Sequence, residues 1–116
     1  MRMPVPENKQ VFVRFHKDLC ERIEDYANEV GKKKATVVTE ILEKYIQSPF
    51  PLSPISSMYL MRRGRSNEKV KGKGMNITIK KVIDNEIRIR AEREGMAENE
   101  FRTYILASFL ENERGR

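Results

Sequence analysis

Hydrophobic and polar residues change period along the chain, and these periods predict where the elements lie. Near the start, side chains alternate, with Val11, Val13 and Phe15 on one side and Gln10, Phe12 and Arg14 on the other. Strict alternation predicts a β-strand. Residues 17–30 and 34–47 then carry apolar stripes at helical spacing, which predict two amphipathic helices. Gly31 lies between them and is expected to end the first helix in the left-handed conformation.

The same order of elements occurs a second time, 64 residues later. With this shift Val13 aligns with Ile77, Ala27 with Ala91, and Gly31 with Gly95. The second copy predicts a strand over 75–80 and helices over about 83–94 and 98–111. On its strand Ile77 and Ile79 face one side, and Asn76 and Thr78 face the other. The chain is therefore expected to contain a strand-helix-helix unit repeated in register.

A segment of different composition separates the two units. Residues 48–57 contain three prolines, and residues 62–74 are basic and contain glycine. The predicted division is a first unit at 1–47, a linker at 48–73 and a second unit at 74–116. The chain has a net charge of +6, and the linker holds most of the excess, with six basic residues against Glu68.

Neither unit is expected to fold by itself. About 40 residues bury too little surface for a stable core, and a single strand leaves its backbone groups without partners. Pairing of the two units solves both problems. The predicted fold is mostly α with a two-stranded antiparallel β-ribbon, formed as an intramolecular pseudo-dimer or by units from two chains.

Two stretches carry a family resemblance: QVFVRFHKDLCERIEDYANEVGKKKATVVTEILEKYI and MNITIKKVIDNEIRIRAEREGMAENEFRTYILASFL. Each resembles the ribbon-helix-helix family of Arc-type repressors. The resemblance implies that the paired strands lie in the DNA major groove. It also implies that the start of each second helix binds a backbone phosphate. The implied base-contacting residues are Gln10, Phe12, Arg14, Asn76 and Thr78.

The chemistry of these side chains suits bases to different degrees. Arg14 can bind guanine through two hydrogen bonds, and Gln10 or Asn76 can bind adenine in the same way. Thr78 can donate, accept or touch a thymine methyl group. Phe12 has two interpretations, which are contact with a thymine methyl group and packing beside a linker residue.

The expected phosphate contacts depart from the family pattern. A serine or threonine commonly follows the glycine by two residues in the family, whereas this chain has Lys33 and Ala97 there. The basic stretch before the second strand is expected either to lie along DNA as an arm or to remain a mobile linker. The residues expected to contact phosphate are Lys32, Lys33, Lys34, Thr36, Ala97, Asn99, Arg62, Arg63, Arg65 and Lys80.

Other functional classes are disfavoured by the sequence. Cys20 is the single cysteine and His16 the single histidine, so no catalytic pair, metal site or cofactor is expected. We expect His16 to cap a helix or lie on the surface, and Cys20 to be a small packing residue. No apolar run reaches the roughly 20 residues of a membrane helix. A cytoplasmic protein that is not an enzyme is expected.

The leading functional hypothesis is sequence-specific binding of double-stranded DNA by a transcriptional repressor. Two alternatives are an architectural accessory protein of conjugative DNA transfer, bound near a transfer origin, and an antitoxin-like module that binds a protein. The sequence also allows self-association on DNA and a protein partner at residues 48–61. Because the base-facing positions differ between the two units, an intramolecular pseudo-dimer is expected to read an asymmetric site.

Overall fold

A computed structural model describes residues 7–60 and 71–114 of the chain. Its elements, in order, are β1 (Asn8–Val13), α1 (Lys17–Val30), α2 (Lys34–Gln47), the 3-10 helix η1 (Pro54–Tyr59), β2 (Met75–Lys80), α4 (Lys81–Arg93) and α5 (Glu98–Arg114). The fold is mostly helical, with one two-stranded antiparallel sheet. This confirms the predicted fold class.

The two strands pair in a register centred on Phe12 and Asn76. Val11 lies opposite Ile77, and Val13 lies opposite Met75. Under the 64-residue shift Ile77 is the counterpart of Val13, and Met75 is the counterpart of Val11. Equivalent positions therefore lie symmetrically about the Phe12–Asn76 pair. This pair is the midpoint of the symmetry that relates the two units, although it lies next to the end of the ladder of paired residues.

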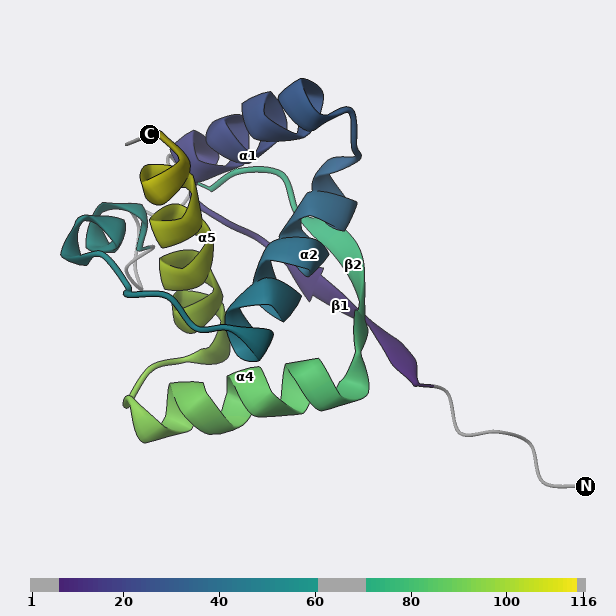
Figure 1. Ribbon diagram of the computed structural model, residues 1–116, viewed down its shortest axis with the longest axis vertical. Helices are drawn as coiled ribbons and strands as arrows, with labels where there is room; N and C mark the ends of the chain where they lie inside the picture. Colours follow the sequence, from purple (N-terminus) through teal and green to yellow (C-terminus); the bar gives the residue numbers. More distant parts are fainter. Residues whose placement is uncertain (1–6, 61–70, 115–116) are drawn as a thin grey trace, which may run out of the picture.

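The helices form a compact layer against the ribbon. Helices α2 and α5 lie between α1 and α4, and η1 packs on α5 (Figure 1). The inner side chains of the strands, Val13, Ile77 and Ile79, are 1–2 % exposed. Most of the remaining core side chains come from the four α-helices, with Phe15 after β1 and Tyr59 of η1 added to them. The helical side chains that are fully enclosed include Leu19, Ile23, Val38, Leu42, Ile87, Ile105 and Leu106.

Both predicted helix-ending glycines have the backbone expected of them. Gly31 has φ +70° and Gly95 has φ +71°, which is the left-handed region that side chains other than glycine rarely adopt. The other end of α1 is capped by His16, whose Nδ1 accepts a hydrogen bond from the Asp18 N–H at 3.1 Å. The expectation that His16 caps a helix is confirmed.

The helices of the second unit differ slightly from their predicted bounds. Helix α4 begins at Lys81, immediately after β2, and α5 continues to Arg114. The Lys81 N–H donates to the Glu7 carbonyl at 2.8 Å, which anchors the strand-helix junction to the start of β1. This non-local contact replaces the loop that the sequence pattern predicted there.

The proline-rich segment after α2 covers α5. Phe50 and Leu52 are half-buried against the core, and Tyr59 is 6 % exposed. The Ser108 hydroxyl of α5 accepts a hydrogen bond from the Ser53 N–H at 2.8 Å. This segment therefore extends the core formed by the α-helices.

Candidate nucleic-acid interface

The outer face of the ribbon exposes every residue predicted to contact a base. Gln10, Phe12 and Arg14 are exposed on β1 and just beyond it, and Asn76 and Thr78 are exposed on β2. Burial of alternate residues on the inner face forces this arrangement, because side chains of a strand alternate between its two faces. One row of mostly polar side chains thus covers the solvent side of the sheet.

The two halves of this outer face differ in chemistry. On one side of the midpoint Gln10 lies opposite Thr78. On the other side Arg14 follows β1, and Gly74 precedes β2. Under the 64-residue shift Gly74 is the counterpart of Gln10, and Thr78 is the counterpart of Arg14. One half therefore presents an amide and a hydroxyl, whereas the other presents a guanidinium and no second side chain.

Phe12, Gly74 and Arg14 form a stack on the outer face. A Cβ atom placed on Gly74 would overlap the Phe12 ring, so the ring occupies the space that the missing side chain leaves. The Arg14 guanidinium carbon lies 5.7 Å from the centre of the same ring. Phe12 nevertheless remains 60 % exposed. It packs beside the residue that follows the linker and still presents an apolar surface outward.

Helix α2 and strand β2 border a shallow groove. A cavity of about 230 Å³ is lined by Thr36, Thr39, Asn76 and Thr78, together with Ala35 and Glu40. The Thr39 hydroxyl donates to the Thr78 carbonyl at 3.2 Å and ties the helix to the strand. The structure thus brings one predicted phosphate contact, Thr36, beside two predicted base contacts.

The lysines before α2 differ in how their charges are paired. Lys32 Nζ lies 2.8 Å from Glu40 Oε2, and Lys34 Nζ lies 3.8 Å from Glu24 Oε2. Lys33 is exposed and has no ion-pair partner among the described residues. Lys33 also occupies the N-cap position of α2, where no side chain caps the helix. The first N–H groups of α2 are therefore available to an anion.

The start of α5 is attached to the end of β1. Asn99 Nδ2 donates to the Arg14 carbonyl at 2.8 Å, and the Thr103 hydroxyl donates to the Asn99 carbonyl at 2.9 Å. Ala97 is exposed just before the helix. Asn99, predicted to contact phosphate, is thus engaged with the backbone beside Arg14. Lys80 is exposed at the end of β2, whereas Arg62, Arg63 and Arg65 lie outside the described residues.

Sequence reasoning missed a buried ionic cluster behind the ribbon. Asp84 of α4 is 1 % exposed, and its Oδ2 lies 2.5 Å from Lys9 Nζ. Its Oδ1 accepts from the buried Arg102 guanidinium at 3.2 Å. Burial raises the pKa of Asp84, but the hydrogen bonds and charges of Lys9 and Arg102 outweigh this effect and lower that pKa overall.

The repeat itself contained a signal for this cluster. Under the 64-residue shift Asp84 aligns with Cys20, and Arg102 aligns with Val38. Two charges at positions that are small or apolar in the other unit indicate a buried pair. Cys20 is half-buried beside Gly72, and burial raises the pKa of its thiol. This placement agrees with the packing role expected for Cys20.

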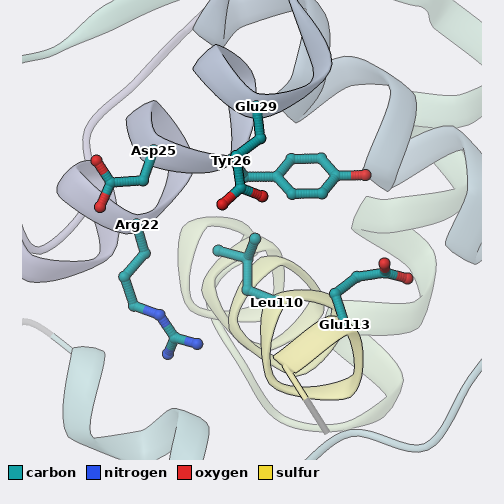
Figure 2. Close-up of a pocket in the computed structure, with 6 residues that line it drawn as sticks. All are labelled: Arg22, Asp25, Tyr26, Glu29, Leu110 and Glu113. Carbon is teal, nitrogen blue, oxygen red and sulfur yellow. The ribbon is translucent and has the colours of Figure 1, made fainter. Parts of the chain in front are cut away.

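A second cavity lies between α1 and the end of α5, and its lining is acidic. Its volume is about 330 Å³, and Figure 2 shows that it is lined by Arg22, Asp25, Tyr26, Glu29, Leu110 and Glu113. Three carboxylates against one guanidinium repel a phosphate backbone. This cavity therefore does not extend the surface made by the ribbon and α2.

The described residues contain neither a metal-ligand cluster nor a membrane-spanning helix. Within residues 7–60 and 71–114, no group of three His, Cys, Asp or Glu side chains is placed to hold a metal ion. No helix in these same ranges has the length and apolar character needed to cross a membrane. No family model, curated protein or solved structure matches the chain.

Proposed function

We propose that this protein binds double-stranded DNA sequence-specifically, with the ribbon β1–β2 in the major groove, and acts as a cytoplasmic transcriptional repressor. The observation that carries the proposal is the outward row Gln10, Phe12, Arg14, Asn76 and Thr78 on a two-stranded ribbon whose opposite face is buried. Arginine, asparagine, glutamine and threonine are the side chains that read base edges. Their fixed positions on a sheet suit recognition of a defined sequence.

The dimensions of the ribbon support this placement. Neighbouring strands lie about 4.8 Å apart, and the major groove of B-DNA is about 12 Å wide. A two-stranded ribbon with side chains therefore fits the groove. The helices pack against the buried face of the ribbon, so they leave its outer face open to DNA.

The start of α2 supplies the proposed backbone contact. Its first N–H groups have no side-chain cap, and Lys33 stands at the N-cap with an exposed ammonium group. A helix N-terminus with a nearby cation favours a phosphate group. Thr36 lines the groove shared with β2. The proposed phosphate contact would therefore lie next to the proposed base contacts Asn76 and Thr78.

The proposed site on DNA is asymmetric. Identical halves read palindromes because both halves present the same side chains. Here Gln10 and Thr78 lie on one side of the midpoint, and Arg14 and Gly74 lie on the other. A single chain bound through this ribbon is therefore expected to read two different half-sites.

Selection from a random duplex library at moderate salt, followed by sequencing, tests the proposal. We expect an asymmetric motif, and we expect Arg14→Ala and Asn76→Ala each to relax a different part of it. Arg93→Ala is the matched control, because Arg93 is exposed at the far end of α4. An absence of enrichment, with binding that disappears as salt rises, would refute sequence-specific recognition.

The basic linker has its own test. If Arg62, Arg63 and Arg65 form an arm on DNA, replacing all three by alanine lowers the slope of log affinity against log salt. The expected decrease is up to about one unit for each phosphate group that the variant no longer binds. An unchanged slope would show that these residues do not contact the backbone.

A further inference from the structure

The outer face of the ribbon contains one apolar side chain in a polar row. Phe12 is 60 % exposed, although residues on either side of it on this face are polar or charged. It also lies at the midpoint of the symmetry that relates the two units, opposite Asn76. An exposed aromatic ring at the centre of a proposed binding surface indicates an apolar feature on the ligand.

Contacts within the protein fix where this ring lies. The ring rests on Gly74, where any side chain would overlap it. The backbone of Gly74 is not in the left-handed region, so its conformation does not require glycine. What the glycine provides here is room for the ring. The inner edge of Phe12 is thus packed, whereas its outer edge faces the solvent.

The same ring limits the positions available to Arg14. The guanidinium carbon lies 5.7 Å from the ring centre, within the range of a cation-π interaction. A guanidinium held in place before binding loses less conformational freedom when it binds. Phe12 can therefore affect recognition in two ways, through its own outer edge and through Arg14.

We propose, on the basis of the DNA binding inferred above, that Phe12 determines specificity for a thymine–guanine element in the site. The 5-methyl group of thymine is the apolar feature of the major groove, and phenylalanine contacts it. Arg14, positioned by the ring, binds guanine N7 and O6. The 5.7 Å separation falls between one and two base-pair rises of about 3.4 Å, which places the guanine within two base pairs of the thymine.

Asn76 completes this recognition from the other strand. Residues directly opposite in a ribbon have Cβ atoms about 4.5–5.5 Å apart. An A·T base pair displays adenine N7 and N6 beside the thymine methyl group in the major groove. Phe12 and Asn76 are therefore expected to read an A·T pair at the centre of the site, with guanine on the Arg14 side.

The test uses the selected duplex, with each thymine replaced in turn by deoxyuridine, which lacks the methyl group. Binding of the full-length protein is measured by fluorescence anisotropy. For the unmodified protein, one replacement near the centre should weaken binding about fourfold, the value of burying one methyl group. For Phe12→Ala the same replacement should have no effect.

Three further binding measurements separate the two roles of Phe12, and a melting temperature serves as the stability control. Replacing the guanine by 7-deazaguanine should weaken binding less in Phe12→Ala than in the unmodified protein, because Arg14 is no longer held. Phe12→Leu should keep the preference for thymine, because leucine is also apolar. The penalty for 7-deazaguanine should fall to the value seen in Phe12→Ala, because leucine has no aromatic ring to hold Arg14. Gly74→Ala should reduce both preferences by displacing the ring, although it removes no side chain. Phe12→Ala should lower the melting temperature only slightly, because the ring is 60 % exposed and lies outside the core.

The outcomes distinguish this inference from the proposed function. If the unmodified protein selects no sequence, DNA recognition by the ribbon is wrong. If the unmodified protein selects a motif, but replacing thymine by deoxyuridine weakens its binding at no position, only the role of Phe12 is overturned. Equal effects of 7-deazaguanine in both proteins would refute the positioning of Arg14 by the ring.

Discussion

The buried cluster of Asp84, Lys9 and Arg102 leads to the sharpest prediction about stability. Asp84→Asn keeps the shape of the side chain but removes its charge, and it leaves the Arg102 guanidinium buried with less compensation. Arg102 is 5 % exposed, and its Nε already has no hydrogen-bond partner among the described residues. Breaking a buried ion pair costs about 3–5 kcal/mol. Since domains are stable by about 5–15 kcal/mol, this variant should lose much of its free energy of unfolding.

The first unit suggests a matched control for this variant. Val38 occupies the position equivalent to Arg102, and it is fully buried. The double variant Asp84→Ala with Arg102→Val removes both buried charges together. Lys9, whose side chain is 32 % exposed, can turn its ammonium group toward water. Apolar replacements of buried ion pairs are often neutral or stabilising, so the double variant should be more stable than Asp84→Asn.

The contribution of Asp84 to the free energy of unfolding should depend on pH in a definite direction. The pKa of Asp84 is lowered on folding, so its contribution to stability is complete above the pKa of the unfolded chain, about 3.9. That contribution is lost as pH falls toward the lower pKa of the folded state. Between pH 7 and 5 the stability gap between the unmodified protein and Asp84→Asn should be constant, and it should narrow below about pH 4.

Urea unfolding followed by circular dichroism, at pH values from 7 to 3, measures three quantities. They are the cost of Asp84→Asn, the stability of the double variant relative to it, and the pH dependence of the stability gap. A cost for Asp84→Asn below about 1 kcal/mol would show that the cluster is weak or hydrated. A double variant no more stable than the single one would refute the argument that the cost comes from a buried guanidinium that has lost one of its two carboxylate partners, Asp84 and Glu98. A gap that persists unchanged to pH 3 would contradict the lowered pKa.

Four other variants test the packing and backbone of the fold. Gly31→Ala and Gly95→Ala should each lower the free energy of unfolding by about 1 kcal/mol or more, because both glycines have positive φ. No atom lies within 4 Å of a Cβ at either position, so backbone strain alone would cause this loss. Unchanged urea midpoints would contradict this expectation. Leu106→Ala should cost about 2–5 kcal/mol, since Leu106 is 0 % exposed; a smaller effect would show that the core collapses around the gap. Ser108→Ala removes the hydroxyl that contacts Ser53 and Ser56, and should cost about 1 kcal/mol and speed hydrogen exchange of the Ser53 amide; unaltered exchange would show that η1 does not depend on this bond.

Much of the fold could be predicted because local periodicity and the repeat agree. The two helices of the first unit have the bounds that the apolar stripes and Gly31 indicate. The first strand spans Asn8–Val13, whereas the alternating residues run from 10 to 15. The register was not predictable from either strand by itself, because it depends on two segments more than 60 residues apart in the sequence. The start of α4 at Lys81 was missed for the same reason, since a hydrogen bond to Glu7 fixes it.

The candidate site was predictable to the extent that burial dictates it. Alternation identified which strand residues face outward, but it could not show that Gly74 makes room for Phe12. Nor could it show that Asn99 is bonded to the Arg14 carbonyl, or that Glu40 pairs with Lys32. These are contacts between side chains and distant segments. They decide which of the predicted groups remain available to a ligand.

The two units agree at the inward positions of their strands and differ at the outward ones, so an asymmetric surface lies on a repeated fold. Inward positions of the strands keep their apolar character, as Val13 and Ile77 do, because both units share one core. The three outward pairs related by the shift are Gln10 and Gly74, Phe12 and Asn76, and Arg14 and Thr78, and all three differ. Identical subunits cannot vary one half of a paired surface without the other, whereas one chain with two units can. If the ribbon binds DNA as proposed, Arg14 on one side of the Phe12–Asn76 pair and Gln10 with Thr78 on the other can therefore recognise different half-sites.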